Sequence, residues 1–249
     1  MWRVSSLGLA LGLSVLGSFG GLIVASTLLL FSDTVRLRLV PWLISYAVGA
    51  LLGVSLLALL PEALQSLSPA TTFGALLCGI VLFFVLEKLV WLRHSHTDDL
   101  HTVAAPLVLF GDAFHNFIDG ATICAAVLSS IPLGVNTAIA VAAHEIPQEV
   151  GDFAILLAAG YSRQRAMVLN LLSGASGIAG ALLAYVAVEV VPAVRPYVLA
   201  ISSASLLYIA MSDLIPDLHR GQLDRSAVRQ VALIAAGVLT VIGFGTLTE

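Results

Sequence analysis

The sequence predicts an all-α integral membrane protein with eight transmembrane helices, and three observations lead to this fold class. First, 59% of the 249 residues are hydrophobic and only 10% are charged, with a mean hydropathy of +1.03, whereas soluble domains average about 25% charged residues. Second, apolar stretches of about 20 residues, long enough to cross a bilayer, recur along the chain. Third, connections rich in Lys and Arg alternate along the chain with connections that contain few of them. No polar stretch is long enough for a soluble domain, so residues 1–249 are expected to form a single polytopic transmembrane domain.

Prolines and clusters of charged residues separate the apolar stretches. They are Pro41, Pro61, Pro69, Pro132, Pro192 and Pro196, with charge clusters at 33–38, 93–101, 160–165 and 217–229. The first stretch is longer than the hydrophobic region of a signal peptide and follows a single basic residue, so we expect it to be retained. The expected helices run over 5–30, 41–62, 72–92, 104–128, 134–159, 166–190, 196–216 and 228–247.

Lys and Arg are distributed very unequally between the two sides of this topology. Of the 11 basic residues, only Arg3 and Arg195 fall on one side. The other nine lie in or beside the connections 31–40, 93–103, 160–165 and 217–229. The positive-inside rule places the basic side in the cytoplasm and both termini outside.

Two spans end in the same short pattern. Leu60-Pro61-Glu62 closes the second span and Ile215-Pro216-Asp217 closes the seventh. These spans run in opposite directions, so the pattern predicts an inverted repeat that relates helices 1–3 to helices 6–8 around the central helix 4/5 pair. A proline followed by an acid is also a common way to leave a membrane helix, and the sequence leaves this alternative open.

The two central spans carry polar groups that hydrocarbon does not tolerate. Residues 112–120 read DAFHNFIDG and residues 144–152 read HEIPQEVGD. Residues 104–159 contain five carboxylates and two histidines but no Lys or Arg. An ionisable side chain at bilayer depth costs roughly 2.5–3.5 kcal/mol on insertion scales, so this set must be protonated, hydrated or neutralised by a cation. His, Asp, Glu, Asn and Gln are also ligands of divalent metals, which predicts a metal site near the midplane.

The spacing of these residues predicts two adjacent clusters between the two helices. His115 and Asp119 are four residues apart and share a helical face, as do His144 and Gln148. Asp119 is placed to bridge both clusters. The first is expected to contain His115, Asp119 and His144, with Gln148 as a further candidate, and the second Asn116, Asp119, Glu145 and either Gln148 or Glu149.

The connection 93–103 is expected to be a cytoplasmic His-containing loop. It holds three histidines and two aspartates within eight residues, 94–101. Such a loop could bind a departing metal ion transiently, or it could be an ordinary solvated loop, and the sequence leaves both open.

The two polar motifs resemble those of the ZIP (Zrt/Irt-like) family of divalent metal transporters. Residues 115–120 match the family's H-N-F-x-D-G, and residues 144–152 are similar to the H-E-x-P-H-E-x-G-D signature of one subgroup, with Gln148 replacing its second His. The resemblance implies a binuclear metal centre between helices 4 and 5. It also implies an elevator-type motion of helices 1, 4, 5 and 6 against helices 2, 3, 7 and 8. The chain departs from relatives at Ala58, where a His is frequent, and at Gly177, where some supply a Glu.

We therefore expect a transporter that moves Zn²⁺, or a similar ion such as Fe²⁺, Mn²⁺ or Cd²⁺, towards the cytoplasm through a midplane site. Its partners are the metal ion and the lipid bilayer, with a homodimer as the candidate oligomer and no nucleic acid. The short chain favours a bacterial inner (plasma) membrane. The expected metal ligands are His115, Asn116, Asp119, His144, Glu145, Gln148 and Glu149.

Two other functional classes compete with this expectation. An intramembrane zinc-dependent hydrolase would use H-E-x-x-H, in which two His bind zinc and Glu is the base, but Gln148 stands where the second His is needed. A non-transporting metal sensor would keep the ligands without moving the ion. We expect no enzymatic activity.

Overall fold

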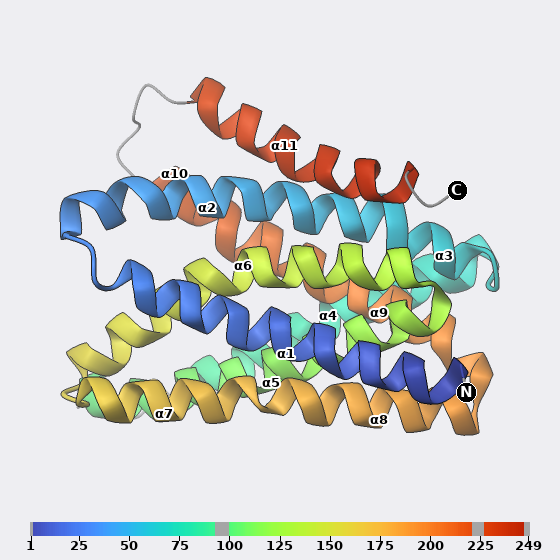
Figure 1. Ribbon diagram of the computed structural model, residues 1–249, viewed down its shortest axis with the longest axis horizontal. Helices are drawn as coiled ribbons and strands as arrows, with labels where there is room; N and C mark the ends of the chain where they lie inside the picture. The colour runs from blue at the N-terminus through green and yellow to red at the C-terminus, as the bar shows by residue number, and fades with distance from the viewer. Residues whose placement is uncertain (1, 93–99, 221–226, 247–249) are drawn as a thin grey trace.

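The computed structural model describes residues 2–92, 100–220 and 227–246, and these ranges contain helices and short connections with no strand. The helices lie side by side along one axis (Figure 1). Six of them are long and apolar enough to cross a membrane, which confirms an all-α integral membrane protein. These six span Ser6–Leu28, Thr34–Leu64, Pro69–Leu89, Arg163–Val190, Pro192–His219 and Ala227–Phe244.

Several of these spans are built from more than one element. In chain order the elements are α1 (Trp2–Leu28), α2 (Asp33–Val54), the π-helix η1 (Ser55–Leu59), α3 (Leu60–Leu64), α4 (Pro69–Leu92), α5 (Leu100–Ser129), α6 (Ile131–Ala158), α7 (Arg163–Gly174), α8 (Ser176–Val190), the 3₁₀-helix η2 (Pro192–Val194), α9 (Arg195–Tyr208), the π-helix η3 (Ile209–Leu214), α10 (Ile215–Arg220) and α11 (Ala227–Thr246).

Helices α5 and α6 form the centre of the bundle. They are 30 and 28 residues long, as long as the six apolar spans, but they carry the buried carboxylates. Ser130 caps α6 by accepting a hydrogen bond from the backbone N–H of Leu133 at 3.3 Å, as expected for a Ser at this position. Helices α1, α7 and α8 pack on α5 and α6, whereas α2 packs on α11 and α4 on α9.

Three prolines that were expected to mark helix boundaries lie inside longer helical segments. Pro41 lies inside α2, which begins eight residues earlier at Asp33, so the charge cluster 33–38 occupies the first turns of a helix. Pro61 and Pro216 are likewise followed by further helical turns in α3 and α10. A proline breaks one backbone hydrogen bond without ending a helix when the flanking turns can rearrange.

The rearrangement before Pro61 and Pro216 is the same in both places. Each proline stands two residues after a π-helical segment, η1 or η3. The N–H of Leu60 bonds to the carbonyl of Ser55, and the N–H of Ile215 bonds to that of Ala210, both five residues back. The wider π turn thereby accommodates the proline, which has no backbone N–H to donate. The two helices concerned run in opposite directions through the bundle (Figure 1).

The sixth expected span, 166–190, is divided into α7 and α8 at Ala175. Small residues at this division allow close approach to α5. A Cβ added to Gly120 would lie 1.8 Å from the backbone oxygen of Gly177, and one added to Gly180 would lie 1.8 Å from that of Phe117. Glycine is therefore required on both sides of the contact between α5 and α8.

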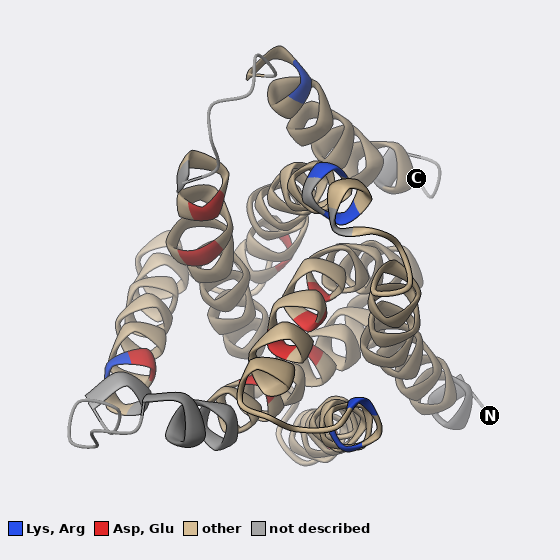
Figure 2. Ribbon diagram, turned by 90° about the vertical axis from the view of Figure 1, so that its left-hand side faces the viewer, with Lys and Arg blue, Asp and Glu red and all other residues tan. Residues whose placement is uncertain are grey.

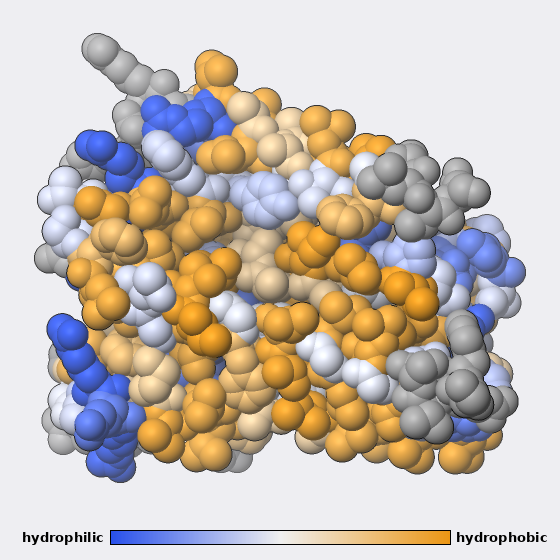
Figure 3. All heavy atoms as spheres, in the orientation of Figure 1, coloured by the Kyte–Doolittle hydropathy of each residue, from blue (hydrophilic) through white to orange (hydrophobic). Residues whose placement is uncertain are grey.

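The molecule has two polar ends and an apolar middle (Figure 3). We define the basic end as the end where α2 and α7 begin, which faces the viewer in Figure 2. Arg36, Arg38, Arg163, Arg165 and Arg229 belong to the elements that start there. Both termini lie at the opposite end (Figure 1). Residues 93–99 of the expected His-containing loop lie outside the described residues, and the remainder, 100–103, forms the first turn of α5.

Candidate metal centre

The two polar motifs meet where α5 and α6 pack together. The Nε2 atoms of His115 and His144 are 2.9 Å apart, with their rings perpendicular. Oδ2 of Asp119 lies 3.6 Å from Nε2 of His115 and 3.2 Å from that of His144. Helical spacing places His115 and Asp119 one turn apart on α5, and the contact with α6 adds His144. The structure therefore brings together the three core ligands predicted from the sequence.

His144 is oriented by the backbone of its own helix. Its Nδ1 lies 3.1 Å from the carbonyl oxygen of Ala140, one turn earlier. When Nδ1 donates its hydrogen to this carbonyl, Nε2 carries a lone pair directed at His115 and Asp119. Histidines that bind metals are commonly fixed in this way by a backbone acceptor.

Among the residues that the structure describes, two groups of side chains have the spacing of metal ligands. Within each group, one potential ligand atom per residue lies within 4.8 Å of those of the others. We call the first the histidine cluster: His115, Asp119, His144 and Glu145. We call the second the carboxylate cluster: Asp112, Glu145 and Glu149.

The membership of these clusters differs from the expectation in two respects. Glu145, and not Asp119, is common to both groups. Asn116 and Gln148 donate hydrogen bonds to Oδ1 of Asp112, at 3.0 and 3.1 Å respectively. The sequence did not predict Asp112 as a ligand, because its part in the second group depends on the rotation of α5 against α6. The ligand roles of Asn116 and Gln148 stay predictions.

Buried carboxylate oxygens without partners surround both clusters. Asp119 and Glu145 are at most 1% exposed, and among the described residues none of their four carboxylate oxygens accepts a hydrogen bond of good geometry, although Oδ2 of Asp119 approaches Nε2 of His144. One oxygen each of Asp112 and Glu149 is also buried and unpaired. Polar groups buried in an apolar environment are normally paired, and in a membrane each unpaired group costs several kcal/mol. A divalent cation would satisfy these oxygens and the two imidazole nitrogens together, so the donor set fits a metal.

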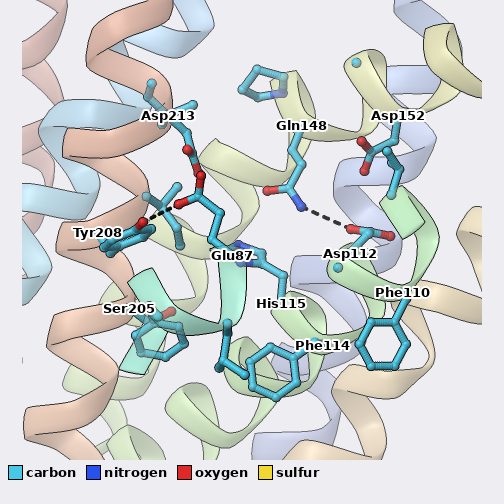
Figure 4. A pocket seen from close by; sticks show the side chains of 18 of the residues that line it. Glu87, Phe110, Asp112, Phe114, His115, Gln148, Asp152, Ser205, Tyr208 and Asp213 are labelled. Atoms are coloured by element: carbon cyan, nitrogen blue, oxygen red, sulfur yellow. Dashed lines mark hydrogen bonds between the residues drawn. The ribbon is translucent and has the colours of Figure 1, made fainter. Parts of the chain in front are cut away.

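A pocket of about 920 Å³ reaches the centre from one direction. It is lined by the later turns of α4, α6, α9 and η3 and by the first half of α5, all of which lie towards the basic end. His115, 18% exposed, and Asp112 form part of its wall. Figure 4 shows Gln148 pointing to Asp112 on one side and Glu87 hydrogen-bonded to the hydroxyl of Tyr208 on the other.

In the half of the bundle away from the basic end, buried hydrogen bonds join the central helices to their neighbours. Thr122 of α5 donates a hydrogen bond to Ser202 of α9 at 2.8 Å, and both side chains are buried. Nδ2 of Asn136 on α6 donates to the carbonyl of Val241 on α11 at 3.2 Å. We call these two contacts the outer seal. They join the central helices to their neighbours on the side where the pocket does not reach.

Gly177 has a packing reason to lack the carboxylate that some relatives carry. A Cβ at this position would lie 3.1 Å from Oγ of Ser18 and 3.2 Å from the backbone oxygen of Asn116. Helix α8 therefore lies so close to α1 and α5 that a side chain at this position would require its neighbours to shift by a few tenths of an ångström. On α7, however, the sequence analysis missed Asn170, which is fully buried next to Glu149.

Comparisons with known proteins agree with these features. The family described as "ZIP Zinc transporter" matches residues 92–247. Zinc transporter ZIP13 of Pongo abelii is 34% identical over 222 residues, which cover 83% of this chain and 67% of that protein. Zinc transporter ZIP4 of Homo sapiens is 31% identical over 244 residues, 70% of this chain and 38% of that protein. Zinc transporter ZIP10 of Danio rerio is 37% identical over 142 residues, and the chain spans only 16% of its length.

Proposed function

This chain belongs to the ZIP family, and from that premise we propose that it transports Zn²⁺ across a membrane through the histidine cluster. One observation carries the proposal: four buried or half-buried potential ligands converge beside a pocket on one side, and within the described ranges the carboxylates of two of them accept no hydrogen bond of good geometry. The names of the relatives specify zinc. Two imidazole nitrogens with carboxylate oxygens suit Zn²⁺. Fe²⁺, Mn²⁺ and Cd²⁺ are proposed as further cargo, because the same atom types accept them.

The proposed topology has eight spans, with α5 and α6 added to the six apolar ones. These two helices are long enough to cross, and their polar groups face each other and the pocket. The positive-inside rule then places the basic end in the cytoplasm and both termini outside. The pocket opens towards the cytoplasm in this topology, which is the state that releases an imported ion. We propose a bacterial inner (plasma) membrane as the location.

The proposed motion moves one group of helices against another. Helices α1, α5, α6, α7 and α8 contact one another extensively. In the other group α2 packs on α11 and α4 on α9, and the short elements η1, α3 and η3 join these two pairs. Fewer pairs join the two groups, mainly α2 with α6 and α5 with α9. This division supports an elevator-type movement that carries the histidine cluster from one side to the other. The matching π-helices before Pro61 and Pro216 support the inverted repeat, since an identical local distortion recurs in antiparallel helices.

The proposed centre has one strong position and one weaker one. The histidine cluster supplies two nitrogen donors, whereas the carboxylate cluster supplies oxygens only. Because Gly177 contributes no side chain and Gln148 is neutral, we propose one tightly held zinc ion per chain and weaker binding of zinc at the second position. Asn116 and Gln148 contribute by holding Asp112.

Two rival functions remain testable against transport. A hydrolase of the H-E-x-x-H type needs a metal-binding His at position 148, where Gln148 instead donates to Asp112. A sensor would bind zinc without moving it. Zinc flux into sealed vesicles that contain only this protein separates the three functions. If the protein is a transporter, zinc should enter vesicles that contain the wild-type protein faster than it enters empty vesicles. Zinc binding without such flux would support a sensor.

A further inference from the structure

Asn170 of α7 is a buried polar side chain that belongs to neither the histidine cluster nor the carboxylate cluster. It is 0% exposed, and in the part of the chain that the structure describes neither its amide nitrogen nor its amide oxygen has a partner at good hydrogen-bond geometry. A buried polar group left unpaired costs about 1–3 kcal/mol. An asparagine in the middle of a membrane helix therefore needs a partner that compensates this cost.

The position of Asn170 identifies the group that it faces. Its side chain lies beside the carboxylate of Glu149, which has an unpaired buried oxygen of its own. One turn later on α7, Ser173 lies beside the carboxylate of Asp112 and donates to the carbonyl of Leu109 at 3.2 Å. Residues 170 and 173 share a helical face, so this face of α7 forms a wall of the carboxylate cluster.

A cation would satisfy these unpaired atoms better than a direct hydrogen bond. If the amide nitrogen of Asn170 donated to Glu149, the amide oxygen would still be buried and unpaired, as would oxygens of Asp112 and Glu145. A cation between the side chains would instead be coordinated by the amide oxygen and the carboxylate oxygens together. The amide nitrogen would then be free to turn towards a carboxylate oxygen that the ion does not use.

We propose that Asn170 completes an all-oxygen cation position together with Asp112, Glu145 and Glu149. Three carboxylates and one amide oxygen, without nitrogen or sulfur, form the ligand set of harder divalent cations such as Mn²⁺. The adjacent histidine cluster offers two imidazole nitrogens and suits Zn²⁺. The two positions therefore differ in ion class, and Glu145 couples them. This inference rests on the proposed function in one respect, because it takes the carboxylate cluster as the second metal position with Glu145 as the residue common to both positions.

The test measures Mn²⁺ and Zn²⁺ binding to the purified full chain by titration calorimetry, with the metal alone as ligand. Asn170→Ala should weaken Mn²⁺ binding roughly 10- to 100-fold, the usual range for residues around a metal, and leave the tight Zn²⁺ site within about twofold of wild type. Asn170→Asp, which keeps the size of the side chain and adds a fourth carboxylate, should strengthen Mn²⁺ binding. Asn136→Ala is the matched control, because it removes another buried asparagine, near the start of α6 and eight residues before His144. It should change neither the Mn²⁺ nor the Zn²⁺ affinity.

Unchanged Mn²⁺ binding in both Asn170 variants would overturn the proposal. So would weaker Mn²⁺ binding in Asn170→Asp, because that result means that Asn170 only donates a hydrogen bond to Glu149. If Asn170→Ala does not fold, Asn170→Asp decides alone. His115→Ala separates this inference from the proposed function: it should remove tight Zn²⁺ binding while Mn²⁺ binding and its dependence on Asn170 persist.

Discussion

The Nε2 atoms of His115 and His144 face each other at 2.9 Å across the contact between α5 and α6. Two nitrogens that each lie about 2.0–2.1 Å from one zinc ion can be this close together. The backbone carbonyl of Ala140 orients one ring from behind, and Asp119 approaches both nitrogens from the side. The geometry is that of a site prepared for a metal, and the predictions below depend on it.

Removing a core ligand should abolish transport. We expect His115→Ala and Asp119→Ala to reduce zinc uptake into vesicles to background, because each removes a donor that the remaining buried ligands cannot replace. Membrane insertion should be unchanged, since the helices keep their apolar faces. His219→Ala is the control, because His219 is exposed on α10, and its uptake should equal wild type. Wild-type uptake by either ligand variant would refute the assignment.

Glu145 should affect both metal positions. Because it belongs to both clusters, Glu145→Gln should weaken Zn²⁺ and Mn²⁺ binding alike. Asp119→Asn should weaken Zn²⁺ binding preferentially, and Asp112→Asn should weaken Mn²⁺ binding preferentially. Calorimetry on the three variants checks this pattern. A Glu145 variant that loses only one of the two ions would show that the clusters are independent.

Gln148 should influence the choice of metal. If its amide oxygen contacts the ion, Gln148→His should raise the affinity for Zn²⁺ relative to Mn²⁺, because imidazole is the stronger donor to the softer ion. Turnover should also slow, since tighter binding delays release. Its hydrogen bond to Asp112 offers the alternative that it acts only through that residue. Competition curves decide: parallel shifts for both ions would exclude Gln148 as a ligand.

The pocket should admit water only from the basic end. Gly151 lines the pocket, and nothing lies within 4 Å of a Cβ added there, so Gly151→Cys should react with a membrane-impermeant thiol reagent applied at that side. Ser202→Cys lies in the outer seal, where the native side chain is 3% exposed, and should be protected from both sides. The native Cys78 is exposed, so both variants require Cys78→Ser. Faster labelling at position 202 than at 151 would contradict the proposed orientation of the pocket.

Sequence periodicity was sufficient to predict that His115, Asp119 and His144 lie together. His115 and Asp119 are one turn apart whatever their surroundings, and a polar face in a membrane helix must turn inward. What spacing could not supply was the rotation of α6 relative to α5. That rotation, set by side-chain packing between helices far apart in the sequence, makes Glu145 the shared residue and brings Asp112 into the second group.

Helix boundaries were less predictable than the site. Pro41 was expected to begin a helix and Pro61 and Pro216 to end helices, yet helical turns precede Pro41 and follow the other two. The π turns that accommodate Pro61 and Pro216 depend on neighbouring helices, which local sequence does not report. Asn170 escaped notice for a similar reason, because a single asparagine in an apolar helix indicates a buried partner only when its neighbours are known.

The position of bound zinc shows whether the histidine cluster is the site that holds the transported ion. Crystals of the zinc-loaded protein should give an anomalous difference peak at the zinc absorption edge between α5 and α6. The account predicts that the strongest peak lies within about 2.0–2.2 Å of Nε2 of His115, Nε2 of His144 and an oxygen of Asp119. A strongest peak at any other place in the molecule, with the histidine cluster empty, would contradict it.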